Sequence, residues 1–298
     1  MYLYRFGMQK LPFGLTPDTE LFCPLEPHIE ALNVLTFAIN SGEALVKVTG
    51  EVGTGKTMLC RLLLNQLDTN RRTAYIPYPK LSARELKFSL AKELGIRIST
   101  ECRDDQLTQR IQTRLLNLNK KHGPVVLVID EAQVLDNDGL ETLRLFTNLE
   151  TEQHKLLQIV LFAQPELDVK LANSKLRQIK QRIVFSYHLK PLNTGQVCAY
   201  VKKRLESVGS TQIRYSVFAN WLVHHYSKGI PRIINILCHK ALLLSFGQNK
   251  DSINAINLIK AAKDTESVNT WIQNHTKLIA ALVAVLASSS AMAFWGIG

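Results

Sequence analysis

The chain has 298 residues, 46% of them hydrophobic, and a formal net charge of +11. This length and composition indicate a globular protein with one large domain or two smaller ones. The five cysteines are odd in number and form no Cys-x-x-Cys pair. That pattern argues against a disulfide framework or a clustered zinc site, and it favours a reducing compartment.

The N-terminal 41 residues are expected to form a proline-containing lead-in followed by a helix. The first seven residues lack the apolar core that a signal peptide needs. Apolar side chains recur at helical spacing from His28 to Ser41, at positions 29, 32, 35 and 39. We therefore expect a helix over 28–41, and the apolar run that follows predicts a strand over residues 44–49.

Residues 50–57 read Gly-Glu-Val-Gly-Thr-Gly-Lys-Thr and match the nucleotide-binding P-loop pattern. The strand before them and a helix predicted over 58–64 supply the context in which such a loop turns its N–H groups towards a phosphate. Lys56 can reach the β- and γ-phosphates of ATP, and the Thr57 hydroxyl can ligate Mg²⁺. The expected nucleotide-binding residues are Gly50, Glu51, Val52, Gly53, Thr54, Gly55, Lys56, Thr57 and Met58.

The next segment predicts a second strand over 73–77, then two helices, then a third strand over 125–129. Ser82 and Glu85 have the spacing of a capping box for the first helix. Asp104 or Asp105 is expected to cap the second. Residues 125–129 are apolar at every position, which is typical of a parallel strand covered on both faces.

An acidic pair, Asp130 and Glu131, ends this strand and has the Walker B arrangement. Asp130 is expected to hold Mg²⁺ together with Thr57, and Glu131 to polarise the attacking water. An acidic pair alone would equally suit the start of a helix. The assignment depends on its combination with the P-loop and with an uninterrupted apolar strand.

Three further residues are candidates for contact with the γ-phosphate: Gln164, Arg177 and Arg182. Gln164 follows a strand predicted over 156–163 and can orient water, although a turn residue fits the same pattern. Arg177 and Arg182 flank the end of a short helix that precedes a fifth strand over 183–189. Either can stabilise charge on a neighbouring subunit's nucleotide, and Arg182 is preferred. A solvated surface arginine is the alternative.

Beyond Pro191 the pattern becomes wholly helical to about Thr265. Pro231 suits the first turn of one helix, and Arg232 is expected to point from it towards the γ-phosphate. These elements predict an α/β fold with a doubly wound parallel sheet and an all-helical lid. The predicted divisions are a lead-in and first helix over 1–41, a P-loop core over 42–190, the lid over 191–265, a linker over 266–277 and a membrane anchor over 278–298.

The positive charge is unevenly distributed along the chain. Thirteen Lys or Arg residues and one acid lie between Lys170 and Lys240, so the remainder sums to −1. Such asymmetry favours a polyanion nearby: nucleotide phosphate, nucleic acid or the anionic inner face of a membrane. An ordinary solvated basic surface is the alternative.

The last 21 residues, from Leu278 onwards, contain no charged side chain and directly follow Lys277. As a helix they would extend about 31 Å, enough to cross a hydrocarbon core. With Trp295 at the far interface and basic residues before the segment, this predicts a single-pass anchor with a cytoplasmic main body. A helix buried in a partner or lying on the bilayer surface is the alternative.

Taken together, these motifs resemble the AAA+ ATPases, and more narrowly the ExeA/GspA group of general secretion ATPases. The resemblance covers roughly residues 1–265. It is carried by Leu11–Phe13, Thr16–Asp18, Thr49–Thr57, Ile129–Gln133, Gln164–Leu167, Leu176–Gln178, Gln181–Ile183 and Gly229–Asn235. In that family these positions are Walker A, Walker B, sensor 1, the arginine finger and sensor 2. The resemblance also implies that Pro12 and Phe13 lie near the adenine.

Longer members of that group continue past their membrane helix into a periplasmic peptidoglycan-binding domain. Because this chain stops in or just after its predicted anchor, it most resembles the shorter MSHA pilus biogenesis proteins (MshM), and direct peptidoglycan binding is not expected.

The leading hypothesis is an ATPase tethered to the bacterial inner membrane, which supports assembly of a type IV pilus or a type II secretion apparatus. Its subunits are expected to form a ring of six, and its expected partners are pilus or secretion proteins and anionic lipid. The rival is a DNA-binding AAA+ ATPase of the transposition-regulator type, whose basic segment would contact phosphates. A scaffold that binds ATP but rarely hydrolyses it is the third hypothesis.

Overall fold

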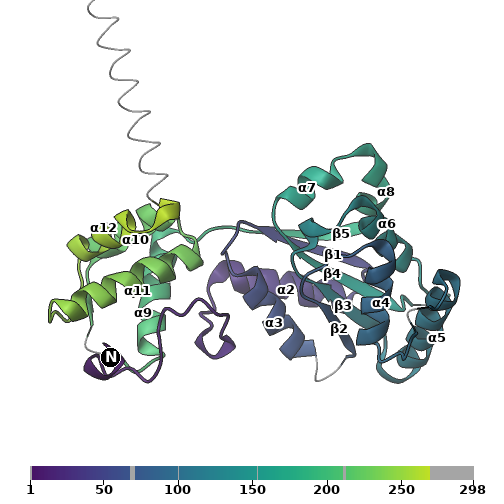
Figure 1. Cartoon of the computed structure of the whole chain (residues 1–298), viewed down its shortest axis with the longest axis horizontal. Coiled ribbons are helices and arrows are strands. Elements are labelled where there is room, and N and C mark those ends of the chain that lie inside the picture. Colours follow the sequence, from purple (N-terminus) through teal and green to yellow (C-terminus); the bar gives the residue numbers. More distant parts are fainter. Residues whose placement is uncertain (1, 68–70, 100, 153, 211–212, 269–298) are drawn as a thin grey trace, which may run out of the picture. The chain divides into compact units, whose positions relative to one another are not determined.

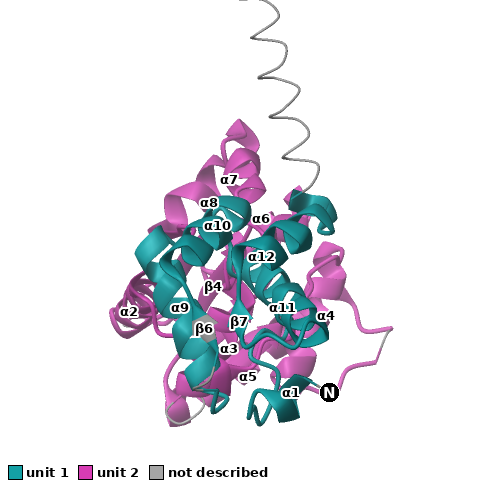
Figure 2. Ribbon diagram, turned by 90° about the vertical axis from the view of Figure 1, so that its left-hand side faces the viewer, with its two compact units in different colours: residues 1–15, 192–298 teal, residues 16–191 magenta. Residues whose placement is uncertain are grey.

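The computed structural model describes residues 2–67, 71–99, 101–152, 154–210 and 213–268 (Figure 1). The chain divides into two compact units, which Figure 2 shows in different colours. One unit, the sheet unit, comprises residues 16–191. The other, the helical unit, combines residues 1–15 with the segment that begins at residue 192.

A five-stranded parallel sheet forms the centre of the sheet unit. Its strands are β1 (Leu45–Gly50), β2 (Thr73–Ile76), β3 (Val125–Ile129), β4 (Leu157–Ala163) and β5 (Ile183–Leu189). They lie in the order β2-β3-β4-β1-β5, and every neighbouring pair is parallel. The predicted α/β fold with a parallel sheet is therefore confirmed.

Helices cover both faces of this sheet. The helices of the unit are α2 (Glu26–Asn40), α3 (Lys56–Leu67), α4 (Ala83–Glu93), α5 (Asp104–His122), α6 (Asn137–Phe146), α7 (Glu166–Leu171) and α8 (Arg177–Arg182). Short 3₁₀ turns lie at η1 (Thr19–Leu21), η2 (Ala132–Val134) and η3 (Ser174–Leu176). Apolar residues of α2 and α3 form one core with the sheet, and those of α4 to α8 form the other.

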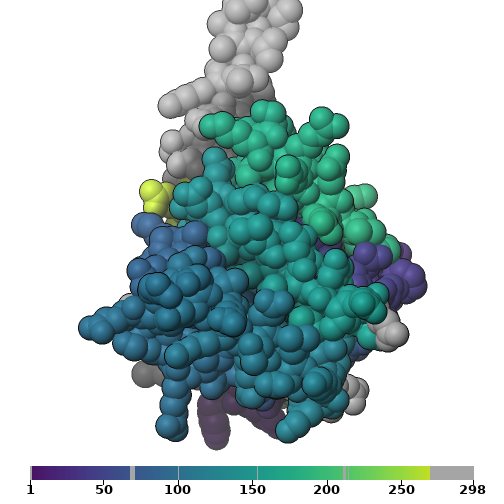
Figure 3. Space-filling model, turned by 90° about the vertical axis from the view of Figure 1, so that its right-hand side faces the viewer, coloured from purple at the N-terminus to yellow at the C-terminus, as the bar shows by residue number. Residues whose placement is uncertain are grey.

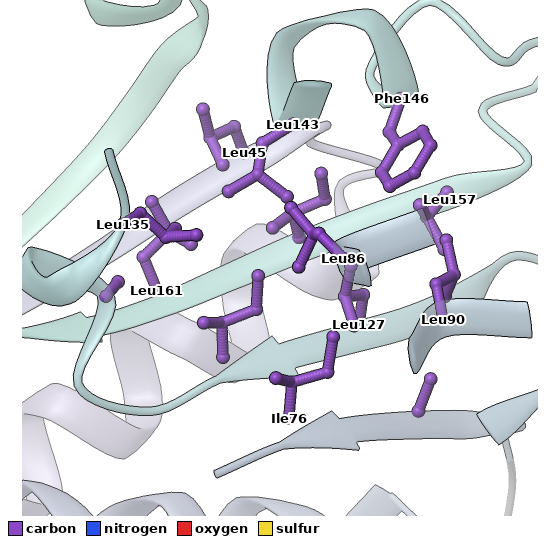
Figure 4. Packing of buried hydrophobic residues seen from close by; sticks show 14 of the residues in the cluster. Leu45, Ile76, Leu86, Leu90, Leu127, Leu135, Leu143, Phe146, Leu157 and Leu161 are labelled. Atoms are coloured by element: carbon purple, nitrogen blue, oxygen red, sulfur yellow. The ribbon is translucent and has the colours of Figure 1, made fainter. Parts of the chain in front are cut away.

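The strand register explains why β3 is apolar throughout and why most positions of β1 and β4 are apolar. Leu127 pairs with Ile159, which in turn pairs with Leu45, and all three belong to the core shown in Figure 4. Their chain neighbours, such as Val128 and Val160, face the opposite core. Successive side chains of a strand point to opposite faces, so a strand between two helical layers buries apolar side chains on both of its faces.

Of the two predicted helix caps, one is confirmed and the other needs correction. The capping box of Ser82 and Glu85 is present at the start of α4. Asp104 and Asp105, in contrast, do not cap α5, because its N-cap is Arg103 and the two acids lie in the first turn. There they still interact favourably with the positive end of the helix dipole.

The helical unit contains α1 (Tyr2–Arg5), α9 (Thr194–Glu206), α10 (Val217–Ser227), α11 (Pro231–Gly247) and α12 (Ala255–Lys263). The prediction that this region is wholly helical was wrong for two short strands, β6 (Arg214–Tyr215) and β7 (Ser252–Ile253), which pair in parallel. Pro231 is the first residue of α11, as predicted.

The N-terminal 15 residues are fastened to these helices. Arg204 Nε donates a hydrogen bond to the Pro12 carbonyl at 2.6 Å, and Asn235 Nδ2 donates to the Gly14 carbonyl at 3.2 Å. The predicted lead-in and first helix, residues 1–41, are thus divided between the two units.

The predicted anchor over 278–298 and most of the linker over 266–277 lie outside the described residues. Within the described ranges, no helix has both the length and the apolar character needed to cross a membrane.

Leu127 provides a test of the core shown in Figure 4, because its side chain is fully buried there. Leu127→Ala should lower the free energy of unfolding by about 2–5 kcal/mol, through lost burial and the cavity left behind. Urea denaturation measures this change. Val169→Ala is the control, since Val169 is 75% exposed and its truncation should cost less than about 0.5 kcal/mol. Equal effects of the two substitutions would contradict the assignment of this core.

Candidate nucleotide-binding site

The P-loop joins β1 to α3 through a tight turn whose backbone conformation requires glycine at several positions. Gly53 and Gly55 have φ angles of 85° and 107°, in the region that L side chains rarely adopt. A Cβ atom on Gly50 would lie 2.9 Å from the Leu189 carbonyl oxygen. The glycines at these positions are therefore required by the backbone path and by the close approach of β5.

The Lys56 side chain is buried and folded onto this loop. Its Nζ donates hydrogen bonds to the carbonyl oxygens of Gly50, at 2.7 Å, and Glu51, at 2.9 Å. An ammonium group has three donors, so a third is available for a phosphate oxygen. Burial lowers the pKa of Lys56, while the carboxylates of Glu131 and Asp130 act in the opposite direction and favour its charged form.

His28, from α2, supports the loop from the protein side. Its Nε2 lies 3.1 Å from the Thr54 carbonyl oxygen, and since that oxygen only accepts, Nε2 carries the hydrogen. A Cβ atom on Gly55 would lie 3.0 Å from the same nitrogen. The ring packs edge-on against Phe22. Burial lowers the pKa of His28, which keeps the imidazole neutral beneath the loop.

Asp130, at the end of β3, is buried beside the start of α3. Burial raises its pKa, and hydrogen bonds from the Thr57 side chain and the Glu131 backbone N–H oppose that shift. The Glu131 nitrogen lies 2.9 Å from Asp130 Oδ1. A hydroxyl and a carboxylate oxygen thus lie side by side. These are hard oxygen ligands of the kind that Mg²⁺ prefers, so the residues fit the predicted metal.

Glu131 has the left-handed conformation, with φ 53° and ψ 38°, which is uncommon for a residue other than glycine. Its Oε2 accepts hydrogen bonds from Gln133 Nε2 and from Gln164 Nε2, the latter at 3.0 Å. Gln133 Oε1 in turn accepts from the Gln164 backbone N–H at 3.0 Å. The ends of β3 and β4 are joined by this polar network, which holds the Glu131 carboxylate in place.

The two arginines of α8 take no part in this network, and the other predicted site residues belong to the helical unit. Arg177 and Arg182 are exposed at opposite ends of α8, and the Arg182 guanidinium donates to Asn148 Oδ1 at 3.0 Å. Arg232 is exposed in the first turn of α11, in the helical unit. Pro12 and Phe13 belong to that unit too, and Phe13 is buried.

Two residues of the site received no individual role from sequence reasoning. Gln133 lies two positions after Glu131, and its role requires the 3₁₀ turn η2, which no periodicity signals. His28 precedes Thr54 by 26 residues, so only the packing of α2 against the loop reveals the contact. A lone histidine at the start of an amphipathic helix carries no signal of this kind.

The lowered pKa of His28 predicts a specific pH dependence of stability. Below the unfolded-state pKa of about 6.5, the unfolded chain binds a proton that the folded chain resists. The free energy of unfolding should therefore fall with falling pH, from about 6.5 towards the depressed value. Urea denaturation at several pH values should show a shallower fall for His28→Gln. His122→Gln, at an exposed histidine, is the control, and identical slopes in all three proteins would contradict the assignment.

Comparison with known proteins agrees with this geometry. Residues 39–171 match a family described as "AAA domain". Over 99% of its length the chain is 39% identical to "General secretion pathway protein A" of Aeromonas hydrophila, and it spans about half, 54%, of that relative.

The solved structures with a similar fold are more distant in sequence. Cdc6p from Pyrobaculum aerophilum is 16% identical, with a TM-score of 0.67 over 84% of this chain and 70% of that one. The ORC1 protein of Aeropyrum pernix, solved in complex with DNA, is 17% identical, with a TM-score of 0.65 over 86% and 69%. RuvB, the Holliday junction branch migration motor of Thermotoga maritima, is 18% identical, with a TM-score of 0.56 over 84% and 72%.

At these identities the solved structures show similarity of fold alone. The AAA match and the curated relative, in contrast, are similarities of amino-acid sequence. Residues 39–171 therefore resemble the AAA domain family, and the chain is similar to general secretion pathway protein A along nearly its whole length.

Proposed function

We propose that the sheet unit binds ATP with Mg²⁺ at the carboxyl ends of β1, β3 and β4 and hydrolyses the γ-phosphate. The observation that carries this proposal is the arrangement of three polar groups around the P-loop. Lys56 lies among carboxylates, Asp130 is hydrogen-bonded to Thr57, and Glu131 is held by the amide of Gln164.

Each of these side chains has a role that its surroundings suit. Backbone N–H groups of residues 50–58 and the Lys56 ammonium would bind the phosphates. Thr57 and Asp130 would hold Mg²⁺, which when bound neutralises charge that develops on the transferred phosphoryl group. Glu131 would accept a hydrogen bond from the attacking water, and Gln164 would orient that carboxylate and report the state of the γ-phosphate.

The arginines belong to the oligomeric part of the proposal. Arg182, or else Arg177, would contact the nucleotide of a neighbouring subunit in a ring, and Arg232 would couple the helical lid to the γ-phosphate. Both α8 arginines are exposed, as a contribution to another subunit requires. Pro12 and Phe13 would contact the adenine.

For the cellular role, we propose an ATPase of the bacterial inner membrane that supports assembly of a type II secretion apparatus or an MSHA-like pilus. Two observations support this. The curated relative is named for general secretion, and the uncharged segment after Lys277 has the length of a membrane anchor.

A second candidate function is DNA binding, which the charge of the helical unit favours. Its described residues, 2–15 and 192–268 apart from 211–212, carry twelve Lys or Arg and four Asp or Glu, a net charge of +8. A surface of this sign attracts phosphodiester as well as anionic lipid.

Two substitutions separate nucleotide binding from hydrolysis. Lys56→Ala should weaken ATP binding by about 1–3 kcal/mol, because it removes a buried charged donor to the phosphates. Glu131→Gln should retain binding and lower turnover by about 100-fold or more, because the amide is a poor acceptor for the proton of water. Equilibrium binding of a fluorescent ATP analogue and a phosphate-release assay measure the two effects. Undiminished turnover in Glu131→Gln would remove Glu131 from this role.

Membrane attachment is tested by fractionation of cells that express the full chain or a version ending at Asn274. We expect only the full chain to resist carbonate extraction, because the uncharged segment supplies the anchor. If both proteins are soluble and the full chain binds DNA in a salt-sensitive manner, the inner-membrane proposal fails and the DNA-binding candidate takes its place.

A further inference from the structure

A groove that shares no residue with the nucleotide site lies along the outer side of α5. It has a volume of about 670 Å³ and is bordered by α5 and by the loop after α4, at residues 95–97. Figure 3 looks onto this side of the sheet unit, where the segments around α4 and α5 are coloured blue. None of the functions considered above uses this groove.

The two faces of α5 explain how the groove arises. Leu107, Ile111, Leu115 and Leu118 form the buried face and pack into the core. The polar residues between them, from Gln106 to Asn117, recur every three or four positions and therefore share one outer face. Gly95, with φ 71°, turns the chain back after α4 and brings the loop beside this face.

Three guanidinium groups line the groove, from Arg97 on the loop and from Arg110 and Arg114 on the helix. The described lining includes no carboxylate, and no ion pair is found for these arginines within the described ranges. The two acids in the first turn of α5 are engaged elsewhere: Asp104 pairs with Lys87, and Asp105 pairs with Arg103. The groove is thus a concave surface with uncompensated positive charge.

Part of this charge is held rigidly. Arg114 Nε donates a hydrogen bond to the Leu94 carbonyl at 3.0 Å, which fixes its guanidinium at the wall while other N–H groups stay available. Arg97 and Arg110 are exposed. A guanidinium group offers a planar fork of donors that matches the two oxygens of a carboxylate.

The other lining side chains narrow the class of ligand. Gln106, Gln109 and Asn117 present primary amides, which can donate to and accept from a peptide backbone. The described lining contains no aromatic ring on which a nucleobase could stack, and stacking supplies much of the affinity for single strands. From Gln106 to Asn117 the helix extends about 17 Å, the length of about five residues of extended peptide.

We propose that this groove binds a short, extended, acidic segment of a partner protein. Carboxylates of the segment pair with Arg97, Arg110 and Arg114, and its backbone is hydrogen-bonded by the amide side chains of α5. Because peptide binding in the groove requires no nucleotide, it can be tested independently of ATP hydrolysis.

The test is fluorescence polarisation with the full chain in mild detergent, without nucleotide. The probe is a labelled peptide of about six glutamates, compared with its glutamine counterpart and with a thymidine oligonucleotide of about equal charge. We expect the glutamate peptide to bind more tightly than the glutamine peptide. R97E/R110E should weaken that binding by about tenfold or more, because it replaces attraction with repulsion in the groove.

K80E/K250E is the matched control, since it makes the same change of net charge at two exposed lysines outside the groove. It should leave peptide binding within about twofold of the wild type, because distant exposed charges are screened. Unchanged urea midpoints verify folding, and R97Q/R110Q replaces the charge swap if that variant fails to fold.

Two results would overturn the proposal. One is equal weakening of peptide binding by both variants, which would indicate a general charge effect. The other is a loss confined to the oligonucleotide in R97E/R110E, which would assign the groove to phosphodiester.

Discussion

The parallel pairing of β3, β4 and β1 is the constraint on which the site depends. Because the strands run in one direction, all their carboxyl ends lie at one edge of the sheet. Gly50, Asp130 and Gln164 lie at or directly after the ends of these three strands. Side chains that are far apart in the chain can therefore meet, as the hydrogen bond between Gln164 and Glu131, 33 positions apart, shows.

That constraint requires burial on both faces of the sheet. Strands β1, β3 and β4 are buried at every position, and helices cover them on both sides. The strand ends are consequently held by two separate cores. A rigid edge of this kind suits phosphate chemistry, which depends on positioning and electrostatics more than on covalent steps by the protein.

The site at the carboxyl ends of the strands also depends on a balance between two buried, oppositely charged groups. Lys56 and Asp130 are both buried, and burial shifts their pKa values in the directions that favour the neutral forms. Each also favours the charged form of the other. In the proposed function, negatively charged phosphates and a positively charged metal would bind between Lys56 and Asp130. An uncharged side chain can hold the loop backbone without altering this balance of charges. The neutral His28 imidazole under the Thr54 carbonyl is such a support.

The amino-acid sequence by itself determined the local structure of several key segments. The glycine pattern of residues 50–57, the uninterrupted apolar run of β3 and the Ser82 capping box predict their structures because each depends on neighbours within a few positions. Tertiary structure alone decided that Gln133 and Gln164 hold Glu131, that His28 supports the P-loop, and that residues 1–15 join the helical unit. It also decided that three arginines share a groove. These contacts join segments whose proximity depends on strand order and on the packing of helices, and neither leaves a periodic signal in the chain.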